Sequence, residues 1–239
     1  MSSSHLLSEP AILYFGTPVV LVGTCNDDGG ANLAPISSAF WLGWRCVIGI
    51  SAASKTTANL KRTGECTLNL PSADEAGAVD RIARTTGSNP VPARKLARGY
   101  TFEPDKFGRA GLTPLDSQTV GAPRAQECPI HLEATVAARH GLADDAPDLR
   151  GAIELFELRV TRVHVRADLL MDGQPNRIDP DKWNPLIMSF QKFYGLSGGQ
   201  VHVSRLSDIP ESAYRSPDVD RARAAWRPAR RVVSGYPVR

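Results

Sequence analysis

The amino-acid sequence predicts a mainly β fold, an antiparallel sheet or barrel with flanking helices and a helical C-terminal extension. Four short stretches, at residues 19–24, 31–38, 44–52 and 66–70, are rich in β-branched residues or alternate in polarity. Turn signals such as Asp27-Asp28-Gly29-Gly30 separate them. The 239 residues are 42% hydrophobic, which is enough for a large buried core. Short strands separated by such turns are typical of an antiparallel β domain.

Two later stretches extend the predicted sheet. From residue 130 to 136 apolar residues alternate with polar ones, which indicates a half-buried strand. In residues 156–165 the apolar positions are even up to Val160 and odd further on. Because side chains alternate along a strand, this change of phase predicts a β-bulge near Thr161-Arg162.

Three helices are expected beside the strands. Ser54 can cap a short helix. A Ser cap followed by two acidic residues predicts a second helix over residues 72–83. Further on, Asn184 can cap a helix that starts at Pro185, carries an apolar stripe and ends at Gly195.

The elements group into a closed β domain over residues 1–166 and a C-terminal extension over residues 167–239. Within the first domain, residues 86–126 are rich in Gly, Pro and isolated charges and show no sustained period. Long irregular segments are often functional, so this one is expected to wrap the surface or to cover a site.

The charge distribution argues against nucleic-acid binding. Residues 215–239 hold seven Arg and two Asp, whereas residues 1–214 carry 21 basic and 23 acidic residues. The body of the protein is therefore slightly acidic. The aromatic interleaving that a nucleic-acid surface requires is missing from the basic tail.

Several other classes of protein are excluded by features that the sequence lacks. The apolar run over residues 11–23 is interrupted at Gly16-Thr17-Pro18 and is too short to span a membrane, so we expect a cytoplasmic, non-membrane protein. The four cysteines form no C-x-x-C pair and the five histidines are scattered, so neither disulfides nor a metal site is expected. Walker, G-x-S-x-G, H-E-x-x-H and G-x-G-x-x-G motifs are absent.

Two polar segments on either side of one strand favour a site for a flat cofactor that carries a phosphate. The first, residues 32–38, includes Pro35, which cannot donate to a sheet and so demands an edge, a bulge or an opening. The second, residues 54–59, offers hydroxyls, the ammonium group of Lys55 and the free N–H groups of a helix start. Alone, each segment is explained by an edge strand or by ordinary helix capping. Together, one strand apart, they indicate a cofactor site.

Three motifs lie in and beside these segments: N-x-A-P-x-S from Asn32 to Ser37, K-T-T-x-N-L from Lys55 to Leu60, and G-E-C-T-L-N-L from Gly64. In order and spacing they resemble the flavin reductase-like family of split-barrel FMN-binding proteins, which includes flavoredoxin and the reductase components of two-component monooxygenases. Family members often have an acid at the position of Thr56, a difference that removes no phosphate contact. The resemblance implies a split β-barrel of Greek-key type that binds FMN.

The resemblance further implies a homodimer with FMN at the subunit interface, NADH or NADPH as electron donor, and a possible partner monooxygenase. The extension and its basic tail would pack on the barrel or on the dimer partner. The residues implied to lie along the flavin ring and ribityl chain are Asn32, Ala34, Pro35, Ser37, Ser38 and Ser51, and those implied at the phosphate are Ser54, Lys55, Thr56, Thr57 and Asn59.

A flavin reductase that transfers hydride from a reduced nicotinamide to flavin is therefore the leading hypothesis. The alternatives are an FMN-containing electron-transfer protein and a tailoring oxidoreductase that uses retained FMN on an organic substrate. His131 and His202 are candidates for contacting nicotinamide or substrate, and a solvent-exposed or hydrogen-bonded structural role is the alternative for each. Trp41 and Trp44 could wall the flavin ring or pack a hairpin.

Overall fold

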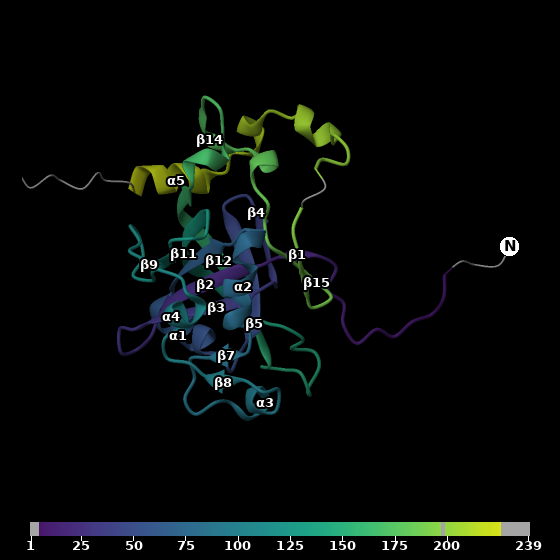
Figure 1. Cartoon of the computed structure of the whole chain (residues 1–239), viewed down its shortest axis with the longest axis vertical. Coiled ribbons are helices and arrows are strands. Elements are labelled where there is room, and N and C mark those ends of the chain that lie inside the picture. The colour runs from purple at the N-terminus through teal and green to yellow at the C-terminus, as the bar shows by residue number, and fades with distance from the viewer. Residues whose placement is uncertain (1–4, 197–198, 226–239) are drawn as a thin grey trace, which may run out of the picture.

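The computed structural model describes residues 5–196 and 199–225 and confirms a mainly β architecture (Figure 1). Its centre is an antiparallel sheet of seven strands in the order β3-β2-β6-β11-β12-β5-β4. All six stretches that the sequence predicts as strands belong to this sheet, and β4 is an additional short strand. The strands are β2 (Val20–Cys25), β3 (Ala31–Ile36), β4 (Ala39–Leu42), β5 (Arg45–Ser51), β6 (Glu65–Leu70), β11 (Ile130–Gly141) and β12 (Ile153–Val165).

The sheet curls into a barrel because its two edge strands are consecutive in the chain. Only Ser37 and Ser38 connect the end of β3 to the start of β4, so opposite edges of the sheet meet at this connection. Among the described residues no strand pairing joins β3 to β4. The barrel is therefore split along this seam.

Both faces of the sheet are buried, because successive side chains of a strand point to opposite sides. One face packs in a core cluster that includes Ile48 and Phe156. The other face packs in a second cluster, in which Leu21 and Leu33 meet Phe107. The helices α2 (Ala76–Arg81) and α4 (Lys106–Ala110) contribute side chains to this second cluster.

Two of the three predicted helices are present. The helix α1 (Lys55–Thr63) begins after Ser54, whose hydroxyl accepts a hydrogen bond from the N–H of Thr57 at 3.0 Å. It ends at Gly64, whose φ of 69° lies in the left-handed region that favours glycine. The second helix consists of a 3-10 turn, η1 (Ala73–Glu75), that leads into α2.

The predicted β-bulge lies in β12. Glu133 of β11 faces Arg162, and the next residue, Ala134, faces Val160. Thr161 therefore has no partner across the ladder. The extra residue shifts the apolar positions of β12 by one, and both halves of the strand still point their apolar side chains into the same cluster.

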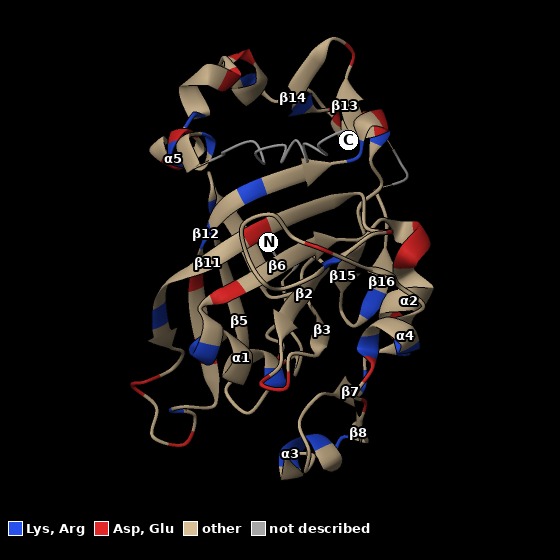
Figure 2. Ribbon diagram, turned by 90° about the vertical axis from the view of Figure 1, so that its left-hand side faces the viewer, with Lys and Arg blue, Asp and Glu red and all other residues tan. Residues whose placement is uncertain are grey.

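The segment predicted as an irregular excursion contains several short elements and returns over the outside of the barrel. They are β7 (Thr85–Thr86), α3 (Ala93–Leu96), β8 (Thr101–Phe102), α4, β9 (Pro114–Leu115) and β10 (Arg124–Ala125). β7 and β8 pair in parallel, and β9 pairs with β10. Figure 2 shows Lys and Arg residues on α3, at the end of the molecule opposite to β14.

The extension contains hairpins as well as helices. The prediction of a helix after Asn184 is wrong, because two short strands form a hairpin there. Phe190 and Gln191, at its turn, have φ values of 45° and 63°, which no α-helix can contain. The described elements of the extension are η2 (Ala167–Leu169), β13 (Leu170–Met171), β14 (Gln174–Ile178), η3 (Pro180–Lys182), β15 (Ile187–Ser189), β16 (Lys192–Tyr194), η4 (Arg205–Asp208), η5 (Glu211–Tyr214) and α5 (Pro217–Ala225). A further short strand, β1 (Thr17–Pro18), lies near the N-terminus.

The extension packs on the barrel at several places, and Leu169 and Leu186 are buried in its two core clusters. β15 pairs with β1, and α5 contacts β12. Asp218 of α5 is buried and accepts hydrogen bonds from Arg45 of β5 at 2.7 and 3.3 Å. Packing on a dimer partner and the domain boundary at residue 166 stay predictions. Most of the basic tail, residues 226–239, lies outside the described residues.

Within the described part of the chain, none of the helices has the length and apolar character that crossing a membrane would need.

A buried carboxylate fastens the loop between β9 and β10 to the sheet. Glu133 accepts hydrogen bonds from the backbone N–H groups of Gln118 and Thr119 at 2.9 and 2.5 Å. The Thr119 hydroxyl and the His164 ring add two more, at 2.6 and 2.7 Å. Burial alone would raise the pKa of Glu133, but these bonds outweigh it and lower that pKa to about 2.

We expect Glu133→Gln to lower the free energy of unfolding near neutral pH by about 1.5–3 kcal/mol, the contribution of a hydrogen bond to a charged group. The loss should shrink as the pH falls below 4.5, the ordinary pKa of Glu, because the wild-type carboxylate then loses its advantage in the folded state. Urea denaturation of both proteins between neutral pH and about pH 3 measures the difference. A difference that is constant over this range would contradict the ionised state assigned to Glu133.

Candidate functional site

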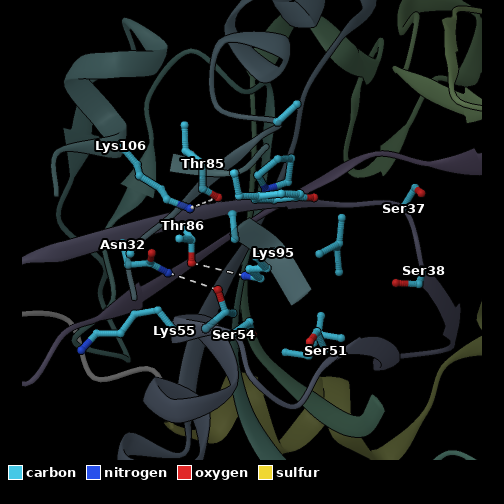
Figure 3. Close-up of a pocket in the computed structure, with 18 of the residues that line it drawn as sticks. Asn32, Ser37, Ser38, Ser51, Ser54, Lys55, Thr85, Thr86, Lys95 and Lys106 are labelled. Atoms are coloured by element: carbon cyan, nitrogen blue, oxygen red, sulfur yellow. Dashed lines mark hydrogen bonds between the residues drawn. The ribbon is translucent and has the colours of Figure 1, made fainter. Parts of the chain in front are cut away.

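A cavity of about 350 Å³ lies at the seam of the barrel (Figure 3). Its walls come from β3, the Ser37–Ser38 connection, β5, the start of α1 and the excursion around β7. One further residue, Tyr14, reaches it from the segment before β1. The cavity therefore joins parts of the chain that are far apart in the sequence.

Most of the cofactor-binding residues implied by the family resemblance are brought together here. The nine that line the cavity are Asn32, Ala34, Pro35, Ser37, Ser38, Ser51, Ser54, Lys55 and Thr56. Pro35 lies on β3, which is an edge strand of the sheet, so the lack of an N–H at this position breaks no ladder. The Ser38 hydroxyl donates to the carbonyl oxygen of Gly49, which links the seam to β5.

Thr57 and Asn59 do not line the cavity and hold α1 in place behind it. The Thr57 hydroxyl donates to the carbonyl oxygen of Ser51 at 2.7 Å. The Asn59 amide donates to Thr24 and Asn26 at 3.0 and 2.9 Å. Both side chains are buried and already hydrogen-bonded. A phosphate role for them stays a prediction of the resemblance.

The ammonium group of Lys55 is engaged outside the cavity. Its Nζ lies 2.6 Å from a carboxylate oxygen of Asp27, in the turn after β2. Figure 3 shows the side chain extending away from Lys95 and Thr86. The start of α1 thus presents the hydroxyls of Ser54 and Thr56 to the cavity, with the charge of Lys55 directed elsewhere.

Two lysines that the sequence analysis did not single out line the cavity instead. Lys106 is 4% exposed, and its Nζ donates to the carbonyl oxygen of Thr85 at 3.3 Å. Lys95 Nζ donates to the Thr86 hydroxyl at 3.3 Å and lies 5.6 Å from the centre of the Tyr100 ring. No carboxylate of the described residues forms an ion pair with either lysine.

Burial lowers the pKa of both lysines. The pKa of Lys106 falls to about 8, because burial and the nearby charge of Lys95 lower it by more than the charge of Glu103 raises it. Burial also lowers the pKa of Lys95. A buried ammonium without a counter-charge is unfavourable, so this end of the cavity is suited to an anion. We call Lys95, Lys106, Thr85 and Thr86 the basic end.

The excursion closes tightly against the start of α1. A Cβ at Gly87 would lie 2.8 Å from Asn32 Oδ1 and 3.2 Å from Lys55 Cγ. Glycine is therefore needed where the backbone of the excursion approaches β3 and α1. This close approach sets the basic end beside the predicted phosphate segment. In the view of Figure 3, Lys106 lies toward one side and Ser37 toward the other.

The weaker candidates from the sequence lie elsewhere. His131 is buried in the sheet, with Nε2 2.8 Å from the carbonyl oxygen of Ala125, and burial lowers its pKa to about 4. His202 is exposed in the segment before η4. Trp41 and Trp44 pack against the first core cluster and do not line the cavity. Among the described residues no group of His, Cys, Asp and Glu could hold a metal ion.

Comparison with known proteins identifies the family of this fold. The model of the flavin reductase like domain matches residues 12–197, which include the barrel, the excursion and the β15–β16 hairpin. The chain belongs to the flavin reductase-like family. Membership supports a flavoprotein role for the chain, and it confirms the resemblance seen in the sequence motifs.

Several proteins resemble this member of the flavin reductase-like family along most of their length. An uncharacterized protein of Bacillus subtilis (strain 168), YdfE, is 36% identical over 188 residues, which cover 79% of this chain and 87% of YdfE. Flavoredoxin of Desulfovibrio vulgaris (Miyazaki F) is 23% identical with a TM-score of 0.66, covering 87% of this chain and 98% of its own. Nitrilotriacetate monooxygenase component B from Bacillus cereus is 21% identical with a TM-score of 0.62, covering 79% and 88%. The two structural similarities establish the split-barrel fold.

Proposed function

We propose that the protein is an FMN-binding flavin reductase, in which a reduced nicotinamide, NADH or NADPH, passes a hydride to the flavin. The observation that carries this proposal is the polarity of the cavity. Its basic end offers two ammonium groups that form no ion pair with a described residue, and its other parts offer hydroxyls, small side chains and the edge of β3. FMN has the same order of groups, with a phosphate at one end, a polyhydroxyl chain and a flat ring.

The donors of the basic end, together with those of the adjoining start of α1, fit a phosphate. Lys95 and Lys106 supply charge, and the hydroxyls of Thr86, Ser54 and Thr56 supply neutral donors. A dianion bound here would give both ammonium groups an ion-pair partner, which neither lysine has among the described residues. It would also favour the protonated form of Lys106. We therefore place the phosphate nearer the lysine pair than to the charge of Lys55.

The remaining cavity residues would orient the other parts of FMN. Asn32 and Ser51 line the cavity, and their polar side chains are suited to hydroxyl groups of the ribityl chain. Ala34, Pro35 and Ser37 would border the ring, where unpaired backbone groups of the β3 edge can meet its polar rim. Bound FMN supplies the redox chemistry, so the protein needs no acid–base motif.

The proposal includes a homodimer in the cytoplasm with FMN at the subunit interface. Phe40 and Leu42, on the edge strand β4, are 54% and 75% exposed, and a second subunit would cover such an apolar edge. Sedimentation of the purified protein decides the oligomeric state. The similarity to a monooxygenase component B leads us to include a partner monooxygenase as an acceptor of reduced flavin.

The purified protein, supplied with FMN, should show flavin absorption bands that bleach when NADH or NADPH is added without oxygen. Steady-state oxidation of the nicotinamide with free FMN as acceptor should follow, because a reductase turns over. A flavin that binds but stays oxidised would contradict the reductase proposal and favour the electron carrier or the tailoring oxidoreductase. Absence of flavin binding would reject all three.

Lys95→Met and Lys106→Met should each weaken FMN binding and leave riboflavin binding unchanged, since riboflavin has no phosphate. Loss of one charged donor is worth about 1.5–3 kcal/mol, so the Kd for FMN should rise about 10- to 100-fold. Fluorescence titration of the apoprotein with both flavins measures this.

Lys61→Met is the matched control, because Lys61 pairs with Glu154 and does not line the cavity. Lys55→Met separates the two possible phosphate positions. A larger loss in this variant than in Lys95→Met and Lys106→Met would return the phosphate charge contact to the start of α1.

FMN binding should weaken as the pH rises above about 8, the pKa of Lys106 in the folded protein. The bound phosphate stabilises the ammonium form, so binding at higher pH requires uptake of a proton, and affinity falls by up to about tenfold per pH unit. Isothermal titration between neutral pH and about pH 9.5 tests this. The slope of log Kd against pH should be smaller in Lys106→Met than in the wild type. An equal slope in both proteins would rule out Lys106 as the titrating group.

A further inference from the structure

The C-terminal hairpin holds the N-terminal segment at the mouth of the cavity. The carbonyl oxygen of Tyr14 accepts hydrogen bonds from the Phe190 N–H at 3.0 Å and from the Ser189 hydroxyl at 3.3 Å. Next to it, the rings of Phe15 and Phe190 meet edge to face, with centroids 5.3 Å apart. Figure 1 shows β1 and β15 side by side, and their register pairs Thr17 with Met188.

Tyr14 depends on this hairpin for its position. It precedes β1 and lies in a segment without regular secondary structure. Its neighbours Leu13 and Phe15 are 64% and 74% exposed, so the segment is not anchored in the core at this point. The contacts that fix the backbone of Tyr14 come from the turn of the hairpin, Ser189 and Phe190.

Tyr14 lies closer to the seam of the barrel than to the basic end. β1 follows Tyr14 after two residues and packs beside β4, which begins directly after Ser38. The cavity has a second tyrosine, Tyr100, which lies under the ammonium group of Lys95 at the basic end. The two aromatic residues thus serve different parts of the cavity, and Tyr14 serves the part where the flavin ring is proposed to lie.

We propose that the Tyr14 ring packs on the flavin ring, and that Phe190 and Ser189 are positioning residues that act through Tyr14. This inference rests on the proposed function. A tyrosine side chain has only two rotatable bonds and offers a flat apolar face, which suits contact with a flat ring. The extension found at the C-terminal side of the barrel then has a defined role, because its hairpin completes the ring part of the site.

Titration of the full-length apoprotein with FMN and with riboflavin tests the inference. Tyr14→Ala should raise the Kd of both flavins by the same factor, about 5- to 20-fold, because the ring is common to both. A lysine variant of the basic end affects FMN alone, so the two contacts have different signatures. Tyr14→Phe should bind both flavins with wild-type affinity, because it keeps the aromatic ring. The bound flavin should be more fluorescent in Tyr14→Phe than in the wild type, because a phenol quenches flavin fluorescence and a phenyl ring does not.

Phe190→Ala should act in the same direction as Tyr14→Ala and add nothing to it in the double variant. Ser189→Ala, which removes only a hydroxyl, should cause a smaller loss of flavin affinity. It tests the same contact should Phe190→Ala fail to fold. Tyr194→Ala is the matched control, since Tyr194 lies on the same hairpin, is 52% exposed and does not line the cavity.

Wild-type affinity for both flavins in Tyr14→Ala would overturn the inference and leave the flavin site intact. A loss confined to FMN would place Tyr14 at the phosphate and overturn it as well. Failure of the wild-type protein to bind either flavin is a different result, which rejects the proposed function itself.

Discussion

The two-residue connection between β3 and β4 is the constraint on which the rest of the structure depends. Because Ser37 and Ser38 join the two edges of one sheet, the sheet must curl, and its edges meet without forming a ladder. A closed barrel has no free edge, whereas this one has an opening with unpaired backbone groups. The cavity lies at that opening. The same short connection that shapes the fold thus positions the site.

Burial of both sheet faces explains why the excursion lies where it does. The outer face presents Leu21 and Leu33, which need an apolar cover. Phe107 and Ile82 provide part of that cover, and the chain between them forms the basic end of the cavity. Packing on the outer face therefore fixes the ends of a segment whose middle has few apolar residues. Lys106 reaches the cavity because its neighbour Phe107 is needed in the core.

Local signals in the sequence predicted one half of the site and not the other. Ser54 as a helix cap and Pro35 as a marker of an edge strand follow from the chemistry of single residues, and both are found as predicted. Lys95 and Lys106 carry no such signal, since their role arises only when the excursion folds back on α1. The hairpin after Asn184 was misassigned because its apolar spacing also suits a helix. Its partner strand β1 lies about 170 residues earlier in the chain, beyond the reach of local patterns.

The bulge at Thr161 divides the long strand β12 into two parts with different neighbours. Up to Arg159 the strand pairs with β5, which lines the cavity, and beyond it β12 pairs with β11 alone and leads into the extension. The first part of the extension thus leaves the barrel at the end of β12 remote from the cavity. The hairpin on β1 is the route by which a longer or shorter extension can alter the site. Divergence among relatives in this region would therefore change how the ring end is closed before it changed the phosphate end.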